Sequence, residues 1–522
     1  MRLHPLKPFR VGVSVAFFAL IALLFLDFGN LLGPVAGEAL YLQFVPSLVK
    51  FMDAATLGAA GCIVIVILTL LFGRVYCSTI CPLGTFQDVI GFAARKKVMR
   101  RGFRFSMPHN VLRHAILAMT VLLLIAGSGF LLNLLDPFSV FGRILTNLVR
   151  PVILLANNAA AVALEQLGVY ALPRERLATI AWFSTGFSLA MLALVAWLAA
   201  RRGRLYCNTV CPVGALLGLL ARVSLLRIAI DSGSCKDCLR CENVCKAGCI
   251  DLGRKRVDFS RCVGCWNCLA VCPRQGMRFQ FRWRRRGSLP QPDPGRRDFL
   301  RNSGLYLLSF TGIPEETMRI IRNRRTTVPV RRTSQVSPPG SGSIARFTAT
   351  CTACHLCVSA CPSRVLVPSF LEFGFLGIMQ PRMDYRAGYC NYECTACLEI
   401  CPSGAILPLA KQEKKLTQLG AAKFIKENCV VFTDNTACGA CSEHCPTKAV
   451  SMVNYANPAN KPLTIPEVKP DYCIGCGACE HACPTRPYKA IFVDGHPVHR
   501  QAKKPVVQTI EVKVDNSEDF PF

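Results

Sequence analysis

The chain has 522 residues, of which 52% are hydrophobic, and its mean hydropathy of +0.34 is high for a soluble protein. This length accommodates several domains, and the hydropathy predicts membrane-spanning segments. The net charge of +29 does not indicate nucleic-acid binding, because no recognition motif accompanies the Lys and Arg residues, which stand in blocks beside apolar runs. The 30 cysteines have metal-ligand spacings, which argues against a disulfide-bonded secreted protein.

Four apolar runs have the length that a bilayer requires of a helix. They comprise residues 11–32, 56–73, 115–135 and 179–200. The connection 74–113 is rich in Lys and Arg, whereas 27–55 contains only Lys50, so the positive-inside rule places both ends of this bundle in the cytoplasm. We therefore expect a four-helix transmembrane bundle over residues 1–230, in the inner membrane of a bacterium. Residues 151–172 carry polar side chains and are expected to form an interfacial helix on the outer side.

A repeated motif follows the second and fourth runs. Gly73-Arg-Val-Tyr-Cys77-Ser-Thr-Ile-Cys81-Pro82 recurs as Gly203-Arg-Leu-Tyr-Cys207-Asn-Thr-Val-Cys211-Pro212. Cysteines four residues apart share one face of a helix, so a pseudo-twofold axis between the copies could bring four thiols around one point. We hypothesise a shared thiolate redox or metal site made of Cys77, Cys81, Cys207 and Cys211, where soft ligands favour an iron–sulfur centre or Cu(I). Two separate dithiol pairs, or cysteines that line a quinone or flavin pocket, are the alternatives.

Residues 231–285 contain two copies of C-x2-C-x2-C-x3-C, the spacing with which bacterial ferredoxins bind [4Fe–4S] clusters. The two sets of four, here called tetrads, are Cys235, Cys238, Cys241 and Cys245, and Cys262, Cys265, Cys268 and Cys272. The fourth cysteine of such a motif usually ligates the neighbouring cluster, so we expect the two tetrads to exchange Cys245 and Cys272. Lys246 replaces the usual Pro and Cys249 is an additional thiol, so Cys249 could take the place of Cys245. Zinc ribbons are the alternative, but zinc knuckles usually stand well apart.

Residues 286–345 have the composition of a linker. Arg296 and Arg297 stand in a sequence that resembles the twin-arginine export signal, and a short apolar run follows them. A surface-bound amphipathic linker is the alternative interpretation. The side of the membrane on which residues 346–522 lie is therefore undecided, and is periplasmic if the signal works.

Residues 346–500 contain four more tetrads, each ending in Cys-Pro, and residues 501–522 form a tail. The tetrads are Cys351, Cys354, Cys357 and Cys361; Cys390, Cys394, Cys397 and Cys401; Cys429, Cys438, Cys441 and Cys445; and Cys473, Cys476, Cys479 and Cys483. Cys351 to His355 also matches the haem signature C-x-x-C-H, but the complete tetrad makes haem the less favoured reading. The histidines of these loops, His355, His444 and His481, are expected at the surface. The sequence thus predicts six [4Fe–4S] clusters in ferredoxin-like α+β modules, one with two clusters and one with four, behind a transmembrane bundle.

On these motifs, residues 1–285 resemble the NapH-type membrane ferredoxins of quinol-oxidising systems, with related bundles in NosR-type and CcoG-type proteins. Residues 296–500 resemble NapG/MauM-type proteins, which have a twin-arginine leader and four [4Fe–4S] motifs. The chain looks like a fusion of the two. In the four-cluster family the first and fourth motifs pair, as do the second and third. The resemblance therefore implies that Cys483 completes the cluster that begins at Cys351, and Cys361 the cluster that begins at Cys473. It likewise implies that Cys445 completes the cluster that begins at Cys390, and Cys401 the cluster that begins at Cys429.

The sequence contains no nucleotide-binding or nucleophile motif, so its chemistry is that of one-electron centres. We expect an electron-transfer component of a quinol dehydrogenase system, which passes electrons between the quinone pool and a separate redox enzyme or carrier. The alternatives are a maturation factor that supplies electrons or metal to another redox enzyme, and a copper reductase acting at the C-x3-C-P pairs. Asp27, Asp53 and Asp136 could accept quinol protons, although structural roles are favoured.

Overall fold

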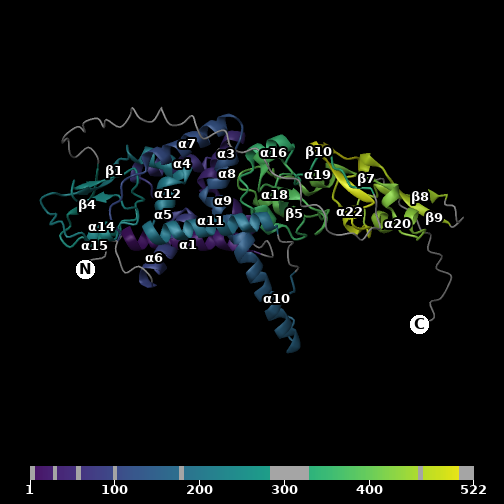
Figure 1. Ribbon diagram of the computed structural model, residues 1–522, viewed down its shortest axis with the longest axis horizontal. Helices are drawn as coiled ribbons and strands as arrows, with labels where there is room; N and C mark the ends of the chain where they lie inside the picture. The colour runs from purple at the N-terminus through teal and green to yellow at the C-terminus, as the bar shows by residue number, and fades with distance from the viewer. Residues whose placement is uncertain are drawn as a thin grey trace, which may run out of the picture.

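The computed structural model describes residues 6–27, 32–54, 60–97, 103–175, 181–281, 328–456 and 462–504. The molecule is elongated, with helices in its middle and small β-sheet modules at both ends (Figure 1). Residues 226–281, which hold the first two tetrads, form one end; we call them the two-cluster segment. Residues 328–504, here the C-terminal part, form the other end. Tetrad-bearing modules therefore lie at opposite ends of one helical bundle.

The helices of the bundle are built from residues 6–221. They are α1 (Leu6–Leu26), α2 (Gly33–Tyr41), α3 (Phe44–Ala54), α4 (Gly61–Phe72), α5 (Tyr76–Thr79), α6 (Pro82–Lys97), α7 (Asn110–Ile125), α8 (Phe130–Leu135), α9 (Pro137–Ile144), the π-helical turn η2 (Leu145–Val149), α10 (Arg150–Gln166), α11 (Trp182–Arg202), α12 (Leu205–Thr209) and α13 (Pro212–Ala221). Within the described ranges, three helical stretches are long and apolar enough to cross a membrane, namely Leu6–Leu26, Pro137–Gln166 and Trp182–Arg202. α1 and α11 lie along the long axis of the molecule (Figure 1).

The second and third expected spans are not single long helices. α4 has 12 residues, which at 1.5 Å per residue is about 18 Å, well short of a hydrocarbon core of about 30 Å. α7 has 16 residues and ends before Gly127, whose φ of 79° is left-handed and breaks the helix, and α8 begins three residues later. The third expected span is therefore divided at Gly127, and α4 by itself is too short to cross the bilayer, so the presence of four spans stays a prediction.

α10 leaves the bundle at a steep angle to α1 and α11 (Figure 1). The chain that follows folds back along it, because Asn158 exchanges hydrogen bonds of 2.7 and 2.9 Å with the backbone of Glu175. Arg174 adds an ion pair with Glu165. This direction agrees with the prediction that residues 151–172 form a helix in the membrane interface. That placement stays a prediction.

The two ends are built from short helices and two-stranded antiparallel sheets. The two-cluster segment contains β1 (Leu226–Ile230), α14 (Arg240–Asn243), β2 (Ile250–Asp251), β3 (Arg256–Val257), α15 (Asn267–Val271) and β4 (Met277–Phe281), and β1 pairs with β4. The C-terminal part contains α16 (Ile344–Thr350), α17 (Leu356–Ala360), β5 (Leu366–Pro368), η5 (Phe375–Gly377), β6 (Pro381–Met383), α18 (Ala396–Ile400), α19 (Lys411–Leu416), β7 (Thr417–Phe424), η6 (Lys426–Asn428), α20 (Val430–Thr433), α21 (Ala440–Glu443), β8 (Val450–Tyr455), β9 (Leu463–Val468), η7 (Pro470–Tyr472), α22 (Ala478–Ala482) and β10 (Ile491–Gln501). In both ends, buried cysteines take part in the hydrophobic clusters beneath these small sheets.

Both ends pack directly on the bundle. One hydrophobic core contains Cys265 of the two-cluster segment, the bundle cysteines and Cys354 of the C-terminal part. At the first end, the amide of Leu225 donates to the carbonyl oxygen of Leu70 over 2.8 Å. At the other end, the hydroxyls of Thr146 and Ser359 are 2.9 Å apart. The tetrads at the two ends are therefore joined through a continuous packed interior.

Candidate metal centres

The four tetrads with regular spacing share one backbone conformation. The residues directly before and after the second cysteine have positive φ in each loop: Asp237 and Leu239, Gly264 and Trp266, Ala353 and His355, and Gly475 and Gly477. Five of these eight positions carry a side chain other than glycine, which costs roughly 1–2 kcal/mol in this region of backbone conformation. Thr395 and Gly439, in the two stretched loops, have negative φ instead. The repeated C-x2-C-x2-C spacing thus encodes a loop that wraps its cysteines around one point.

The two-cluster segment exchanges its fourth cysteines as expected. Cys245 lines one pocket together with Cys262, Cys265 and Cys268. Cys272 lies close enough to Cys241 to interact with it electrostatically, as Cys235 does. Four thiols around such a space fit the ligand set of a [4Fe–4S] cluster.

Cys249 also lines this pocket, and its sulfur is 3.5 Å from that of Cys245. Cys265 and Cys268 interact electrostatically with Cys245. This arrangement favours Cys245 as the ligand and leaves Cys249 as a buried thiol beside it.

The C-terminal part pairs its tetrads differently from the expectation. Cys401 approaches Cys351, Cys354 and Cys357, and Cys361 approaches Cys390 and Cys397. Cys483 lines one pocket with Cys429, Cys438 and Cys441. Cys445 approaches Cys473, Cys476 and Cys479. The first-with-fourth and second-with-third pairing is therefore wrong: the first tetrad exchanges its fourth cysteine with the second, and the third with the fourth, because α17 packs against α18 and α21 packs against α22.

The resulting sites follow one another outward from the bundle. Cys357 neighbours Cys397 of the next site, and the amide of Cys390 donates to the carbonyl oxygen of Cys476 over 2.9 Å. Cys479 in turn neighbours Cys441 of the outermost site. At the other end, Cys268 neighbours Cys241. The six tetrads thus form two short rows, one on each end of the bundle.

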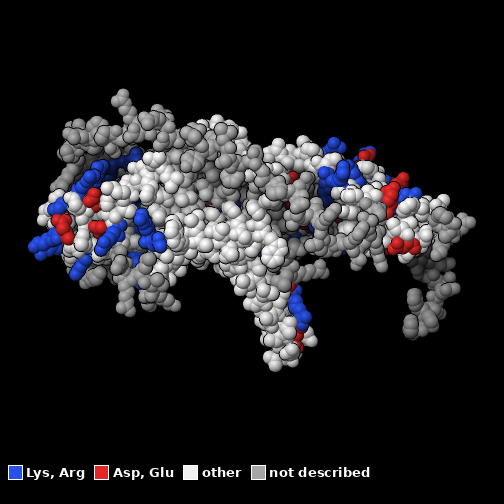
Figure 2. Space-filling model, viewed as in Figure 1, with Lys and Arg blue, Asp and Glu red and all other residues white. Residues whose placement is uncertain are grey.

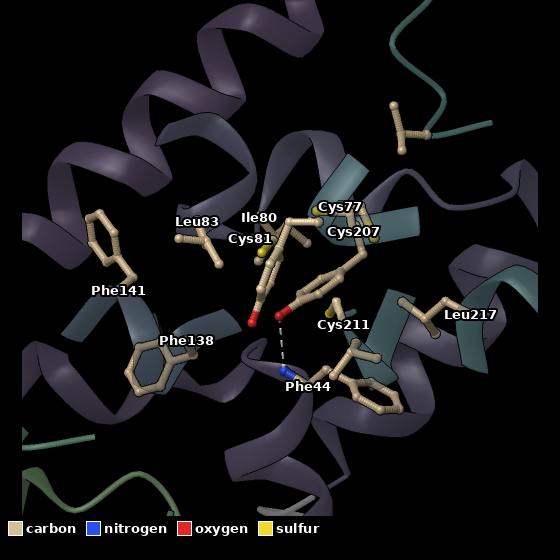
Figure 3. Packing of buried hydrophobic residues seen from close by; sticks show 14 of the residues in the cluster. Phe44, Cys77, Ile80, Cys81, Leu83, Phe138, Phe141, Cys207, Cys211 and Leu217 are labelled. Atoms are coloured by element: carbon tan, nitrogen blue, oxygen red, sulfur yellow. Dashed lines mark hydrogen bonds between the residues drawn. The ribbon is translucent and has the colours of Figure 1, made fainter. Parts of the chain in front are cut away.

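Between these rows, the repeat brings its four cysteines together. We call Cys77, Cys81, Cys207 and Cys211 the four-thiol centre; all are buried, and each interacts electrostatically with the other three. They lie among aromatic and aliphatic side chains from several helices, including Phe44, Phe138 and Leu217 (Figure 3). Within the described part of the chain, no three His, Cys, Asp or Glu side chains gather tightly enough to hold a single metal ion. That these four thiols bind a metal or a cluster stays a prediction.

The two copies of the repeat hold each other by exchanged arginines. Arg74 donates to the carbonyl oxygen of Cys207 over 2.9 Å, and Arg204 donates to that of Cys77 over 2.6 Å. A methyl group at Gly84 would stand 2.2 Å from the Cys77 oxygen, and one at Gly214 would stand 2.1 Å from the Cys207 oxygen. Both contacts are too close for any side chain. The Gly-Arg-x-Tyr-Cys-x3-Cys-Pro-x-Gly repeat is thus a pseudo-twofold structural unit.

One carboxylate neutralises several of the buried cations beside this unit. Asp88 contacts Arg204 and Lys246 at 2.9 Å and Arg10 at 3.6 Å. Burial by itself would raise the pKa of Asp88, but the charges and hydrogen bonds of Arg204 and Lys246 outweigh burial and hold this pKa well below its usual range. Lys246, the residue that replaces the usual proline of the first tetrad, therefore ties the two-cluster segment to the bundle.

The remaining candidates have structural partners. Asp27 accepts from the amide of Leu32 at 2.8 Å, Asp53 pairs with Arg346 at 2.5 Å, and Asp136 caps α9 by accepting from Ser139. His355 is buried rather than at the surface, and its ring nitrogens lie within hydrogen-bond distance of the Met379 carbonyl and Asn147. His444 is exposed and His481 is half-buried.

Sequence reasoning missed the buried arginines Arg10, Arg74, Arg113, Arg143 and Arg204. Two of these arginines could have been found from the sequence, because Arg74 and Arg204 occupy the same position in the two copies of the repeat. For the others, the sequence offers no periodic or repeated pattern.

Comparison with known families agrees with these sites. The 4Fe-4S binding domain family matches residues 54–101 and 184–230, which are the two copies of the repeat. The 4Fe-4S dicluster domain family matches residues 350–405, which hold the first two tetrads of the C-terminal part, and 436–486, which hold the other two except for Cys429. No solved structure matches the chain.

Several curated proteins are similar to the first half of the chain. The ferredoxin-type protein NapH of Haemophilus influenzae is 29% identical over 258 residues, which cover 48% of this chain and 74% of the relative. The resemblance to the NapH-type family is confirmed. The methylamine utilization ferredoxin-type protein MauN of Methylobacillus flagellatus is 27% identical over 176 residues, 33% of this chain and 48% of the relative. The putative electron transport protein YccM of Escherichia coli is 24% identical over 213 residues, 40% of this chain and 51% of the relative.

With its apolar helices and [4Fe–4S] domains, this NapH-like chain is an iron–sulfur electron-transfer protein of the membrane. The tetrads would hold the clusters, which supply one-electron chemistry when bound. The polypeptide would fix their spacing.

Proposed function

We propose that this protein carries electrons across the membrane, between the quinol pool and a partner oxidoreductase, through six [4Fe–4S] clusters. The two-cluster segment faces the cytoplasm and the C-terminal part faces the periplasm. The chain then combines a NapH-type bundle with a NapG/MauM-type four-cluster part in one polypeptide.

The observation that carries this proposal is the position of the two rows of tetrads at opposite ends of one apolar bundle (Figure 1). Had both parts stood on the same side, electrons could pass between them without the bundle. Instead, the packed core that joins Cys265 to Cys354 runs through the bundle. A route between the two rows therefore passes through the membrane domain.

Charge supports the orientation. Figure 2 shows Lys and Arg side chains over the two-cluster segment and, mixed with Asp and Glu, over the C-terminal part, while the central helices are nearly free of charged side chains. The exposed basic residues there are Lys236, Arg240, Arg254, Arg256, Arg274 and Arg278. Positive charge at one end of a membrane domain favours the cytoplasmic side. In this orientation the C-terminal part is exported, and the twin-arginine-like motif at Arg296 and Arg297, which lies outside the described residues, would direct it.

Reduction by quinol tests the activity. The oxidised protein is purified without oxygen, mixed with a reduced menaquinone analogue, and followed by the loss of cluster absorbance. Bleaching on the timescale of turnover is expected. No bleaching, while dithionite still reduces the clusters, would remove the quinol pool as donor and favour a maturation role or a ferredoxin as donor.

Reporter fusions test the orientation separately. Alkaline phosphatase, which is active only outside the cytoplasm, is fused after Lys504 in the full chain or after Phe281 in a truncated chain. Activity is expected for the fusion at Lys504 and not at Phe281. Activity at neither position would place both rows of tetrads in the cytoplasm and contradict transfer across the membrane.

A further inference from the structure

The four-thiol centre lies between the two rows of tetrads and is packed in the same core as Cys265 and Cys354. We infer that Cys77, Cys81, Cys207 and Cys211 bind a seventh [4Fe–4S] cluster inside the bundle. The role of this cluster in carrying electrons rests on the proposed function. Its binding by the four cysteines rests on the geometry of these residues.

Each of the four sulfurs accepts a hydrogen bond from nitrogen. Gln87 Nε2 donates to Cys207 Sγ over 3.2 Å, and Arg74 Nη2 donates to Cys77 Sγ over 3.8 Å. The amide of Gly214 donates to Cys211 Sγ over 3.3 Å, and the amide of Gly84 donates in the same way to Cys81.

A neutral thiol is a weak acceptor, whereas sulfurs that ligate iron–sulfur clusters commonly accept such bonds. Cys211 and Cys81 also stand at the N-termini of α13 and α6, where the backbone favours negative charge. The surroundings are therefore built for four thiolates.

Buried cations around the centre lack sufficient negative partners. Arg10, Arg74, Arg113 and Arg204 are each at most 4% exposed. Asp88 pairs with Arg10 and Arg204, but among the described residues no carboxylate lies within ion-pair distance of Arg74 or Arg113. Arg74 instead contacts neutral oxygens and Cys77 Sγ, and its Nε has no partner. A buried guanidinium is costly without a counter-charge, and an anionic cluster with its thiolates would supply one.

The ligand chemistry favours a cluster. All four candidate ligands of the centre are cysteine sulfurs, as in the six ferredoxin tetrads, and thiolates are the ligands of [4Fe–4S] clusters. Two ligands come from each copy of the repeat, so the pseudo-twofold axis of the crossed arginines passes between the two pairs.

Such a cluster would link the two rows of tetrads. It would accept one electron from the neighbouring cluster of Cys245, Cys262, Cys265 and Cys268, and would return to its oxidised state by passing that electron to the cluster of Cys351, Cys354, Cys357 and Cys401. No atom is transferred and no further oxidant is needed, since quinol or another low-potential donor reduces the chain at its start.

The test is the iron content of the full-length protein after replacement of the four cysteines by serine. Anaerobically purified protein is compared with this variant and with a Cys62→Ser control, whose cysteine is buried in α4 outside the centre. The expected result is the loss of one cluster's complement of iron and acid-labile sulfide from the fourfold variant and none from the control. Unchanged iron and sulfide, or the loss of copper or zinc instead, would overturn the inference while leaving the six-cluster function intact.

Arg74→Gln provides a second test in which all four cysteines remain. Removal of the cation should lower the reduction potential of one cluster, measured by electron paramagnetic resonance during a redox titration, and Arg74→Lys should restore part of the shift. Identical potentials for every cluster in Arg74→Gln and the parent would also overturn the inference. Quinol-dependent bleaching, measured in the same samples, reports the proposed function independently.

Discussion

Arg204 donates a hydrogen bond of 2.6 Å to the carbonyl oxygen of Cys77, and so ties the second copy of the repeat to the first. The same guanidinium pairs with Asp88 at 2.9 Å in a fully buried position. Arg204→Gln should therefore destabilise the bundle by about 3–5 kcal/mol, since breaking a buried ion pair leaves Asp88 with less compensation. Thermal unfolding in detergent measures the loss. Arg201→Gln, an exposed arginine at the end of α11, is the matched control and should leave the midpoint unchanged; equal losses for both variants would contradict a special role for Arg204.

Arg143 should set the potential of the cluster nearest the bundle in the C-terminal part. It is 1% exposed, its Nε and Nη1 have no partner, and it interacts electrostatically with Cys354. A nearby cation stabilises the added electron, so Arg143→Gln should lower this cluster's reduction potential by roughly 60 mV, a tenfold change in its one-electron equilibrium. A redox titration followed by electron paramagnetic resonance measures the shift.

Arg346→Gln is the control for Arg143, because Arg346 lies at the same interface but already pairs with Asp53 at 2.5 Å. This variant should leave the cluster potentials in place. A shift of similar size in both variants would mean that the interface, rather than the charge of Arg143, governs the potential.

The exchange of fourth cysteines predicts which ligand variants share a phenotype. Cys401→Ala should change the same spectroscopic species as Cys354→Ala, because both ligate one cluster. Cys361→Ala should instead change the species that Cys397→Ala changes. Mössbauer or paramagnetic resonance spectra of these four variants and of Cys441→Ala provide the comparison. If Cys401→Ala altered the species that Cys441→Ala alters, the exchange seen in the structure would be wrong and the pairing implied by the four-cluster family would be correct.

Asp494 should make the stability of the C-terminal part sensitive to acid. Its carboxylate accepts from Thr333 N at 2.8 Å and pairs with Lys423 at 2.6 Å. Burial by itself would raise the pKa of Asp494, but Lys423 and the donors of Thr333 outweigh burial and lower this pKa. The contribution to stability is complete above the unfolded pKa of about 4 and is lost as the pH falls through the folded pKa.

Asp494→Asn should remove this acid-dependent contribution and cost about 1–3 kcal/mol at neutral pH. Denaturant unfolding of the parent and the variant, followed by limited proteolysis at several pH values, measures both effects. Asp471→Asn is the control, because Asp471 and its partner Lys503 are both exposed and their ion pair contributes little. The prediction fails if the difference between parent and Asp494→Asn is the same at pH 3 as at pH 7.

The sequence alone determined the cofactor and most ligands of the candidate sites. The C-x2-C-x2-C-x3-C-P spacing is local, and its loops need only a few backbone angles, such as the positive φ of Ala353 and His355, to aim the sulfurs at one point. The repeat around Cys77 and Cys207 was equally visible, because two matched ten-residue stretches rarely arise by chance. Apolar composition likewise indicated a membrane bundle, although it could not show that Gly127 breaks the third run.

Tertiary structure decided everything that depends on contacts between distant segments. Which tetrad receives Cys401 or Cys483 is set by how neighbouring loops pack, not by spacing along the chain. The crossed bonds from Arg74 and Arg204 join residues 133 and 127 positions apart, and no local pattern specifies such partners. The position of the C-terminal part at the far end of the bundle, opposite the two-cluster segment, likewise follows from side-chain packing across residues such as Thr146 and Ser359. These choices are made by the burial of apolar surface and the pairing of buried charge, which act only once the chain has folded.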